Sequence, residues 1–399
     1  MRPRLFLWLP IVALVMACGS ESTGPGVTAM PSPAPDSSAE PHLTFANGEL
    51  ILSWLVHHGD TLHTLQFAVH SEAGWSDPRT IYQGDDFFAN WADRPSILQL
   101  NDGTWVAHWL QKNGHDTFAY DVRLSRSANG IDWSPSIAPH DDGTETEHGF
   151  VSMVADGNNG LVAVWLDGRD YAHSEHEEAQ MSLRAAHWSP DGVTQAALLD
   201  SRACDCCPTS AVATSRGILV GYRDRGPDET RDISLVRFES GSWSEPWTLQ
   251  DDGWVIKGCP VNGPALDADG SIVCITWYTE AHKKPIVYLA LSSDAGENFQ
   301  QPVRIDDGNP AGRVDVTLLE NGDALVIWLE APAQGDAEIR ARRVRADGHV
   351  DPSFLIARTA AARASGYPQV VRMGDTVYVA WTEASKPSRI RLATLTNLQ

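Results

Sequence analysis

The sequence has few positive charges: 30 Lys and Arg residues stand against 52 Asp and Glu residues, and the formal net charge is -22. So acidic a surface repels the phosphates of nucleic acids and the headgroups of anionic lipids. We therefore expect no nucleic-acid partner. The apolar run near the start of the chain, Leu5–Ala17, is shorter than the roughly 20 residues that a membrane-spanning helix needs, so it does not serve as a span.

Two arginines, Arg2 and Arg4, precede this run, and that order predicts a signal peptide over residues 1–17. The next residues, Val-Met-Ala-Cys18-Gly19, resemble the lipobox of bacterial lipoproteins. The resemblance implies a lipidated Cys18 that anchors the chain to the bacterial cell envelope, and Gly19 in place of Asp favours the outer membrane. The alternative is a secreted protein with an ordinary cleavage site. Loss of Arg2 and Arg4 would change the net charge from -22 to -24.

Large apolar residues are also scarce after Cys18. Residues 18–41 consist mostly of Ser, Pro, Gly, Thr and Ala, which bury too little apolar surface to offset the entropy of ordering. We expect a disordered tether over 18–41 and one folded domain over 42–399.

The folded part contains an internal repeat. Short apolar segments that end in an aromatic residue recur at intervals of 55, 56, 57, 55, 51 and 53 residues, and the seven aromatic residues are Trp54, Trp109, Trp165, Tyr222, Trp277, Trp328 and Trp381. Such a period indicates one structural unit copied along the chain.

Each repeat predicts four short strands: one before the aromatic-ended strand, that strand, one after it, and one after a Trp-Ser-x-Pro turn such as 75–78. Four strands per unit of about fifty residues are typical of a β-propeller blade. We predict an all-β propeller of seven blades, with six as the alternative. The last unit shows only three strands before the chain ends, so its fourth must come from the N-terminal segment or be missing.

Ser292 to Phe299 matches the Asp-box, Ser-x-Asp-x-Gly-x-x-aromatic, and Gly130 to Trp133 looks like an eroded copy. On these residues the chain from 42 to 399 resembles the sialidase-superfamily propellers with BNR repeats. The resemblance implies that the Asp-box is a structural turn between third and fourth strands, on the face away from the active site. Sialidases themselves have six blades.

Residues at the start of successive innermost strands share one face of a propeller, so their side chains should converge. They are spaced by 54, 59, 52, 54 and 54 residues, and they are Arg94, His148, Cys207, Cys259, Arg313 and Tyr367. Converging polar groups at a channel mouth predict a ligand site. The candidate ligand-binding residues are Arg94, Arg223, Asp224, Arg225, Arg231, Asp232, Trp254, Asn262, Arg313 and Asp315. The alternative is a salt-bridged rim that only holds the blades together.

Cysteine is concentrated in one place. Cys204, Cys206 and Cys207 occupy three of four consecutive positions, and Cys259 follows about one repeat later. An oxidising envelope favours a disulfide such as Cys207 to Cys259. The alternative is a copper or zinc site made by the four thiols with His148 nearby. A redox-active pair is a third possibility.

Two further features of the sequence are Cys274 and a second possible metal cluster. Cys274 lies in an apolar strand, where we expect a small buried hydrophobe. A second candidate metal cluster is His173-x-x-His176-Glu177, although a solvated polar loop explains those residues equally simply.

The sialidase resemblance also implies catalytic roles. Sialidases hold a carboxylate with three arginines, and Arg94, Arg223 or Arg225, and Arg313 stand at matching positions. Tyr367 would be the nucleophile and Asp93 the acid and base, but no glutamate can be matched to Tyr367. The predicted function is therefore a channel-mouth site for an acidic glycan-like ligand or a metal. The alternatives are an exo-α-sialidase or related glycoside hydrolase, and a non-catalytic interaction scaffold.

Overall fold

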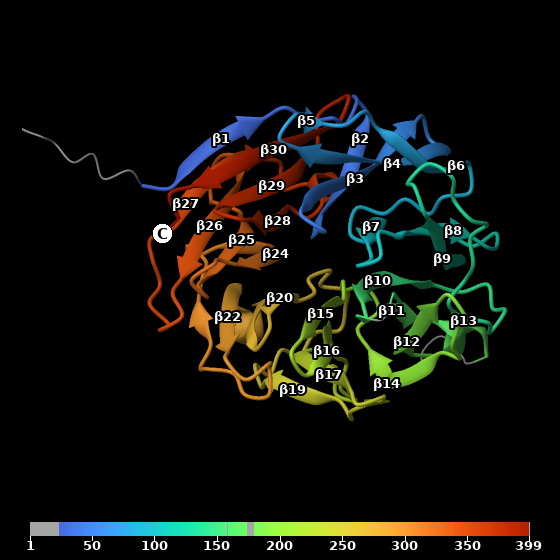
Figure 1. Cartoon of the computed structure of the whole chain (residues 1–399). Coiled ribbons are helices and arrows are strands. Elements are labelled where there is room, and N and C mark those ends of the chain that lie inside the picture. The colour runs from blue at the N-terminus through green and yellow to red at the C-terminus, as the bar shows by residue number, and fades with distance from the viewer. Residues whose placement is uncertain (1–23, 158, 174–178, 399) are drawn as a thin grey trace, which may run out of the picture.

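The computed structural model describes residues 24–157, 159–173 and 179–398. The predicted signal peptide and Cys18 lie outside these residues. Seven antiparallel sheets form a ring, and Figure 1 shows them following one another around the centre in chain order. The prediction of a seven-bladed, all-β propeller is confirmed. Among the described residues, no helix has the length and apolar character that crossing a membrane requires.

We number the blades 1 to 7 in the order of their innermost strands. Blade 1 contains β2 (Ser38–Ala46), β3 (Glu49–His58), β4 (Leu62–Ser71), β5 (Gly74–Trp75) and β6 (Arg79–Gly84). Blade 2 contains β7 (Ser96–Gln99), β8 (Trp105–Lys112) and β9 (Tyr120–Ser127). Blade 3 contains β10 (His148–Ala155), β11 (Leu161–Asp167), β12 (Met181–Ser189), β13 (Gly192–Val193) and β14 (Ala197–Ala203). Blade 4 contains β15 (Ser210–Thr214), β16 (Gly217–Arg223), β17 (Ile233–Glu239), β18 (Ser242–Trp243) and β19 (Trp247–Gln250).

The remaining blades follow the same order. Blade 5 contains β20 (Ala265–Asp269), β21 (Ile272–Thr279), β22 (Ile286–Ser292) and β23 (Val303–Arg304). Blade 6 contains β24 (Pro310–Leu318), β25 (Ala324–Glu330), β26 (Ala337–Val344) and β27 (Phe354–Thr359). Blade 7 contains β28 (Gln369–Met373), β29 (Thr376–Glu383), β30 (Arg389–Thr396) and β1 (Gly26–Met30). Three short 3-10 helices lie in loops: η1 (Arg169–Ala172), η2 (Ala281–Lys283) and η3 (Arg363–Ser365).

The N-terminal strand closes the ring. β1 pairs antiparallel with β30, from Gly26 opposite Thr396 to Met30 opposite Leu392, and so completes blade 7 (Figure 1). The predicted boundary at residue 42 is therefore too late, because part of the segment assigned to the tether belongs to the propeller. The composition of 18–41 does not indicate this strand, because β1 is largely exposed and is held by backbone hydrogen bonds, which need no large apolar side chains.

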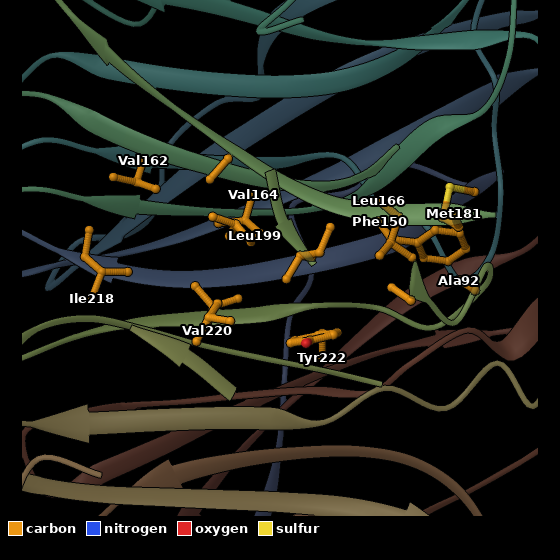
Figure 2. Close-up of a cluster of buried hydrophobic side chains, with 14 of the residues drawn as sticks. Ala92, Phe150, Val162, Val164, Leu166, Met181, Leu199, Ile218, Val220 and Tyr222 are labelled. Atoms are coloured by element: carbon orange, nitrogen blue, oxygen red, sulfur yellow. The ribbon is translucent and has the colours of Figure 1, made fainter. Parts of the chain in front are cut away.

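The repeating aromatic residues lie on the second strand of each blade and form the core between blades. Trp54, Trp165, Trp277 and Trp328 are fully buried. Figure 2 shows the packing between blades 3 and 4, where Val162, Val164 and Leu166 of β11 face Ile218, Val220 and Tyr222 of β16. Apolar residues of one sheet face thus pack on the next blade, which explains why the repeat is visible in the sequence.

Each innermost strand is the edge of its sheet, and polar side chains of neighbouring blades bind its free backbone groups. Such contacts join blades 2 to 7 in sequence: Asp93 Oδ2 to Phe150 N (2.7 Å), Thr209 Oγ1 to Phe150 O (2.8 Å), Ser210 Oγ to Leu266 N (3.0 Å), Asp267 Oδ2 to Leu318 N (2.7 Å) and Asp315 Oδ2 to Val370 N (2.8 Å). Asp93 and Asp315, which we predicted as catalytic and ligand-binding residues, therefore connect blades. Burial raises the pKa of Asp93 to about 8 and that of Asp315 to about 7.

Removal of β1 should destabilise the propeller. A chain that starts at Ser32 loses the five residue pairs with β30, whereas a chain that starts at Gly24 keeps them. We expect the shorter chain to lose about 3 kcal/mol of unfolding free energy, because each net backbone hydrogen bond contributes roughly 0.5–1.5 kcal/mol. Urea unfolding of both chains measures this difference, and equal stabilities would show that β1 does not hold blade 7.

The Asp93→Asn variant should change how stability depends on pH. The pKa of Asp93 in the folded protein, about 8, lies above its ordinary value of 3.8. Its protonation therefore favours folding below pH 4, and this contribution is lost as the pH rises through about 8, by at most about 1.4 kcal/mol per pH unit. Asparagine stays neutral and keeps an oxygen for Phe150 N, so the variant should lose less stability than the wild type between pH 5 and 8.

Urea unfolding at the two pH values measures the effect, with the exposed Asp60→Asn as the matched control. Identical pH slopes for Asp93→Asn and the wild type would mean that Asp93 is ionised in the fold, as a catalytic carboxylate would be.

Candidate functional site

Three of the four clustered cysteines meet where the chain passes from β14 of blade 3 to β15 of blade 4. The thiol sulfurs of Cys204 and Cys207 lie 3.4 Å apart. One ligand atom from each of Cys204, Cys206 and Cys207 falls within a group no wider than 4.8 Å. Cys204 and Cys207 are fully buried and Cys206 is half-buried. All five described cysteines are unbonded thiols.

Cys259 lies in the segment that joins β19 of blade 4 to β20 of blade 5. Its thiol is exposed and interacts with that of Cys206, which in turn interacts with Cys204 and Cys207. We call these four residues the thiol cluster. The four cysteines therefore lie close together, and the thiol that interacts with Cys259 is that of Cys206, whereas the disulfide suggested from the sequence joined Cys259 to Cys207.

Tight backbone packing fixes the cluster. A Cβ on Gly263 would lie 1.8 Å from the carbonyl oxygen of Pro208, so only glycine fits there. This contact brings the Cys207-Pro208 segment against the Asn262-Gly263 segment, and the Asn262 N–H donates to Cys207 Sγ at 3.4 Å. On the other side, the Cys204 N–H donates to the carbonyl of Arg223 at 3.0 Å.

A buried arginine stabilises negative charge on the cluster. Arg231 Nη1 donates to Cys204 Sγ at 3.0 Å. Burial alone would raise the pKa of Cys204, but the Cys206 and Cys207 thiols and the charges of Arg231 and Arg223 outweigh it and hold the pKa well below its ordinary value. These contacts thus favour the thiolate form of Cys204, which is the form that binds metals and acts as a nucleophile.

A network of ion pairs surrounds the thiols. Glu229 accepts hydrogen bonds from Arg225 (2.9 Å) and Arg231 (2.9 Å), and these contacts lower its pKa to about 2. Arg225 also reaches Asp205 at 3.3 Å. The predicted ligand-binding residues Arg225 and Arg231 therefore belong to the surroundings of the thiol cluster.

Arg223 has a structural role, contrary to our prediction of a ligand contact. Its Nε donates to Asn262 O (2.8 Å), its Nη1 to Arg231 O (2.6 Å) and its Nη2 to Tyr278 O (2.6 Å). The guanidinium lies over the ring of Trp254 at 4.8 Å and is 1% exposed. With all three nitrogens donating to backbone carbonyls, Arg223 joins blades 4 and 5 and has no face left for a ligand.

Four more predicted ligand residues also bind the protein itself. Asn262 Oδ1 accepts from Arg313 N at 2.7 Å, and Arg313 Nη1 donates to Ser365 Oγ at 2.8 Å. Asp232 accepts from the backbone N–H groups of Gly253 and Trp254, and Asp224 accepts from Arg225 N and Ser234 Oγ. These contacts are those of a rim that holds the blades together, which is the alternative given for them above.

Arg94 is different, because its guanidinium faces the central channel with donors to spare. Among the described residues, neither its Nε nor its Nη1 has a hydrogen-bond partner, although both atoms are buried. It lines a cavity of about 400 Å³ together with Asp315 of β24 and with Asp93 and Tyr367, which lie just before β7 and β28. The guanidinium lies 5.1 Å from the centre of the Tyr367 ring, which stacks at 6.0 Å on Trp91.

Tyr367 does not have the surroundings of a sialidase nucleophile. Its hydroxyl donates to the carbonyl oxygen of Val261, and burial raises its pKa above the ordinary value. A nucleophilic tyrosine needs a base and a lowered pKa. With Asp93 bound to Phe150 N as well, the two residues do not form the catalytic pair that the resemblance implied.

His148 lies apart from the thiols. Its Nε2 is 3.2 Å from Asp142 Oδ2, and its ring stacks on that of His140 at 3.9 Å. It was therefore wrongly grouped with the cysteines. Of the other proposed cluster, His176 and Glu177 lie outside the described residues. His140 and Asp142 precede the innermost strand β10, so the comparison of strand starts does not include them; the short spacing of His140, Asp142 and His148 is the sequence signal for this group.

Comparisons with known proteins give the fold. No family model matches the chain, and no curated protein matches it. Similar solved structures include a PL25 ulvan lyase (TM-score 0.60, 13% identity, covering 91% of this chain and 95% of that one). A protein of unknown function from Dyadobacter fermentans gives a TM-score of 0.53 at 16% identity, covering 93% and 97%. A leech intramolecular trans-sialidase gives 0.50 at 10% identity, covering 93% and 91%. At these identities the likeness concerns the fold alone, and the β-propeller fold of the chain is consistent with the sialidase-like propeller that the Asp-box residues predicted.

Proposed function

We propose that this protein binds a soft metal ion, copper(I) or zinc, at the thiol cluster. The observation that carries the proposal is the convergence of Cys204, Cys206 and Cys207 within 4.8 Å, with Arg231 on the Cys204 sulfur. Thiolates are the preferred ligands of copper(I) and among the preferred ligands of zinc. A metal replaces the protons of closely spaced thiols with one cation, which removes the repulsion that a second and third thiolate would otherwise meet.

The graded exposure of the cluster supports binding from solvent. Cys204 and Cys207 are buried, Cys206 is half-buried and Cys259 is exposed. An incoming ion would meet Cys259 first and then Cys206, with which Cys259 interacts. The buried pair would then supply the dry, soft ligands. We place this activity in the bacterial cell envelope, on a lipid anchor at Cys18 and with the outer membrane favoured, as the sequence predicted.

The alternative at this site is that the cysteines form disulfide bonds. Measurement of metal uptake distinguishes a metal site from disulfides. We expect the protein, purified anaerobically without chelator, to bind one copper(I) per chain in competition with a chromogenic copper(I) chelator. The Cys204→Ser/Cys207→Ser variant should bind more than about 100-fold more weakly, since it loses two ligands. Cys274→Ser removes a buried thiol in β21 and should leave the affinity unchanged.

The opposite outcome is equally clear. If peptide mass spectrometry finds bonded pairs among Cys204, Cys206, Cys207 and Cys259, and no metal binds without a reductant, the cysteines brace blades 4 and 5 and the proposal fails.

A second candidate function, recognition of an acidic glycan-like ligand, rests on Arg94. Buried guanidinium nitrogens without partners bind a carboxylate in two-point fashion, and the cavity of about 400 Å³ has room for one sugar ring. Similar folds include an ulvan lyase and a trans-sialidase, which fits such a ligand. We do not extend this candidate to sialidase catalysis, because Tyr367 donates to Val261 O and contacts no base among the described residues.

Binding of sialosides and uronate oligosaccharides, measured by calorimetry, tests this second candidate. We expect Arg94→Gln to weaken binding about 10-fold to 100-fold, because the charge-assisted hydrogen bonds are lost. The exposed Arg358→Gln on β27 is the matched control. A protein that binds no member of the panel, or binds equally well without Arg94, would leave the propeller as a metal-binding or interaction scaffold.

A further inference from the structure

A second group of metal-ligating side chains lies between blades 2 and 3, away from the thiols. Asp121 comes from β9, His140 from the following loop, and His148 from the first position of β10. Asp121 Oδ1 lies 3.8 Å from His140 Nε2 and 3.9 Å from His148 Nδ1. Three ligand atoms of different residues therefore surround one small space.

A shared carboxylate orients both imidazoles. Asp142 Oδ2 lies 3.3 Å from His140 Nδ1 and 3.2 Å from His148 Nε2. When each ring donates a proton to Asp142, the lone pair of each opposite nitrogen points toward Asp121. A carboxylate behind a histidine is the usual support of a metal-bound imidazole, because it fixes the tautomer and raises the basicity of the ligand nitrogen.

His140 has a buried ring nitrogen that lacks a hydrogen-bond partner among the described residues. Its side chain is 4% exposed, and its Nε2 is buried and has no hydrogen-bond partner among the described residues. A buried nitrogen without a partner is unfavourable unless something binds it. Asn113 Nδ2 donates to Asp121 Oδ1 at 2.6 Å and holds the third ligand in place.

The local charge balance also calls for a cation. Three carboxylates, Asp121, Asp142 and Asp167, face two guanidiniums. Arg169 lies 3.1 Å from Asp142 and 2.6 Å from Asp167, and Arg184 lies 3.8 Å from Asp167. With neutral histidines this group has one negative charge in excess, which either a bound cation or a protonated His148 would balance.

We propose that Asp121, His140 and His148 bind a divalent first-row metal ion such as zinc. Two imidazoles and one carboxylate are a ligand set that zinc accepts, with a fourth position left for water or a substrate. Asp121 is the most exposed of the three, with 22% of its side chain accessible, and marks the side from which the ion enters. The site does not depend on the thiol cluster, and the two sites differ in ligand chemistry.

The alternative to a metal is a proton on His148. His148 Nδ1 also lies 3.1 Å from the carbonyl oxygen of Thr146 and 3.3 Å from that of Tyr120. A proton on Nδ1 would satisfy these oxygens and make His148 a cation, with no metal bound. The rival leaves His140 Nε2 without a partner, whereas the metal site uses it.

Cobalt(II) added to the full-length protein distinguishes the sites, because thiolate ligands give intense ligand-to-metal charge-transfer absorption and histidine and carboxylate ligands do not. We expect the wild type to take up one cobalt with that absorption and one without it. His140→Gln and Asp121→Asn should each abolish the second uptake and leave the first unchanged. The exposed His349→Gln should change neither. Circular dichroism checks that each variant is folded.

A measurement on the wild type keeps the proposal testable if the variants do not fold. Addition of zinc should shift the imidazole nitrogen resonances of His140 and His148 together, with saturation at one equivalent. The proposal is overturned if the wild type binds only sulfur-ligated cobalt, if uptake is the same in His140→Gln, or if His148 keeps both ring protons in the presence of excess zinc.

Discussion

The structure depends on how the innermost strands satisfy their free backbone groups. Each of these strands is a sheet edge that faces the central channel, and an unpaired edge is unfavourable unless something binds it. In this chain, carboxylate and hydroxyl side chains of neighbouring blades bind the edges, as Asp93 does at Phe150 N and Asp315 does at Val370 N. Many polar residues at the channel therefore hold the blades together. Only polar residues that do not bind the backbone of another blade are available for a ligand.

The distinction between polar residues that bind backbone groups and those that do not identifies the candidate site. Arg223 uses every nitrogen on backbone carbonyls, and Asn262 positions both Arg313 N and Cys207 Sγ. Because these residues hold the segments around Pro208 and Gly263 in contact, the thiols are brought together by a rigid backbone. A preorganised set of soft ligands binds a metal without the entropy cost of gathering them. The thiol cluster and the channel face of Arg94 are what remains once the structural contacts are accounted for.

Much of the fold could be predicted from the sequence. Burial of one aromatic residue per blade, such as Trp165 and Trp277, imposes a period of about 55 residues, and that period shows in the sequence. The sequence offered the N-terminal segment as a source for the fourth strand of blade 7, but the residues of β1 could not be located, since an exposed strand held by backbone bonds has no hydrophobic pattern. The cysteines were recognised because thiols at such density have few structural uses. Asp93 and Arg223 were misassigned because a polar residue at a channel looks the same in sequence whether it binds a backbone group or a ligand.

X-ray absorption spectroscopy of the copper(I)-loaded protein shows whether the thiols hold a metal, because it reports the atoms bound to the ion. We expect a first shell of three or four sulfur atoms, supplied by Cys204, Cys206, Cys207 and Cys259. A shell dominated by nitrogen or oxygen, or a protein that takes up no copper(I), would contradict it.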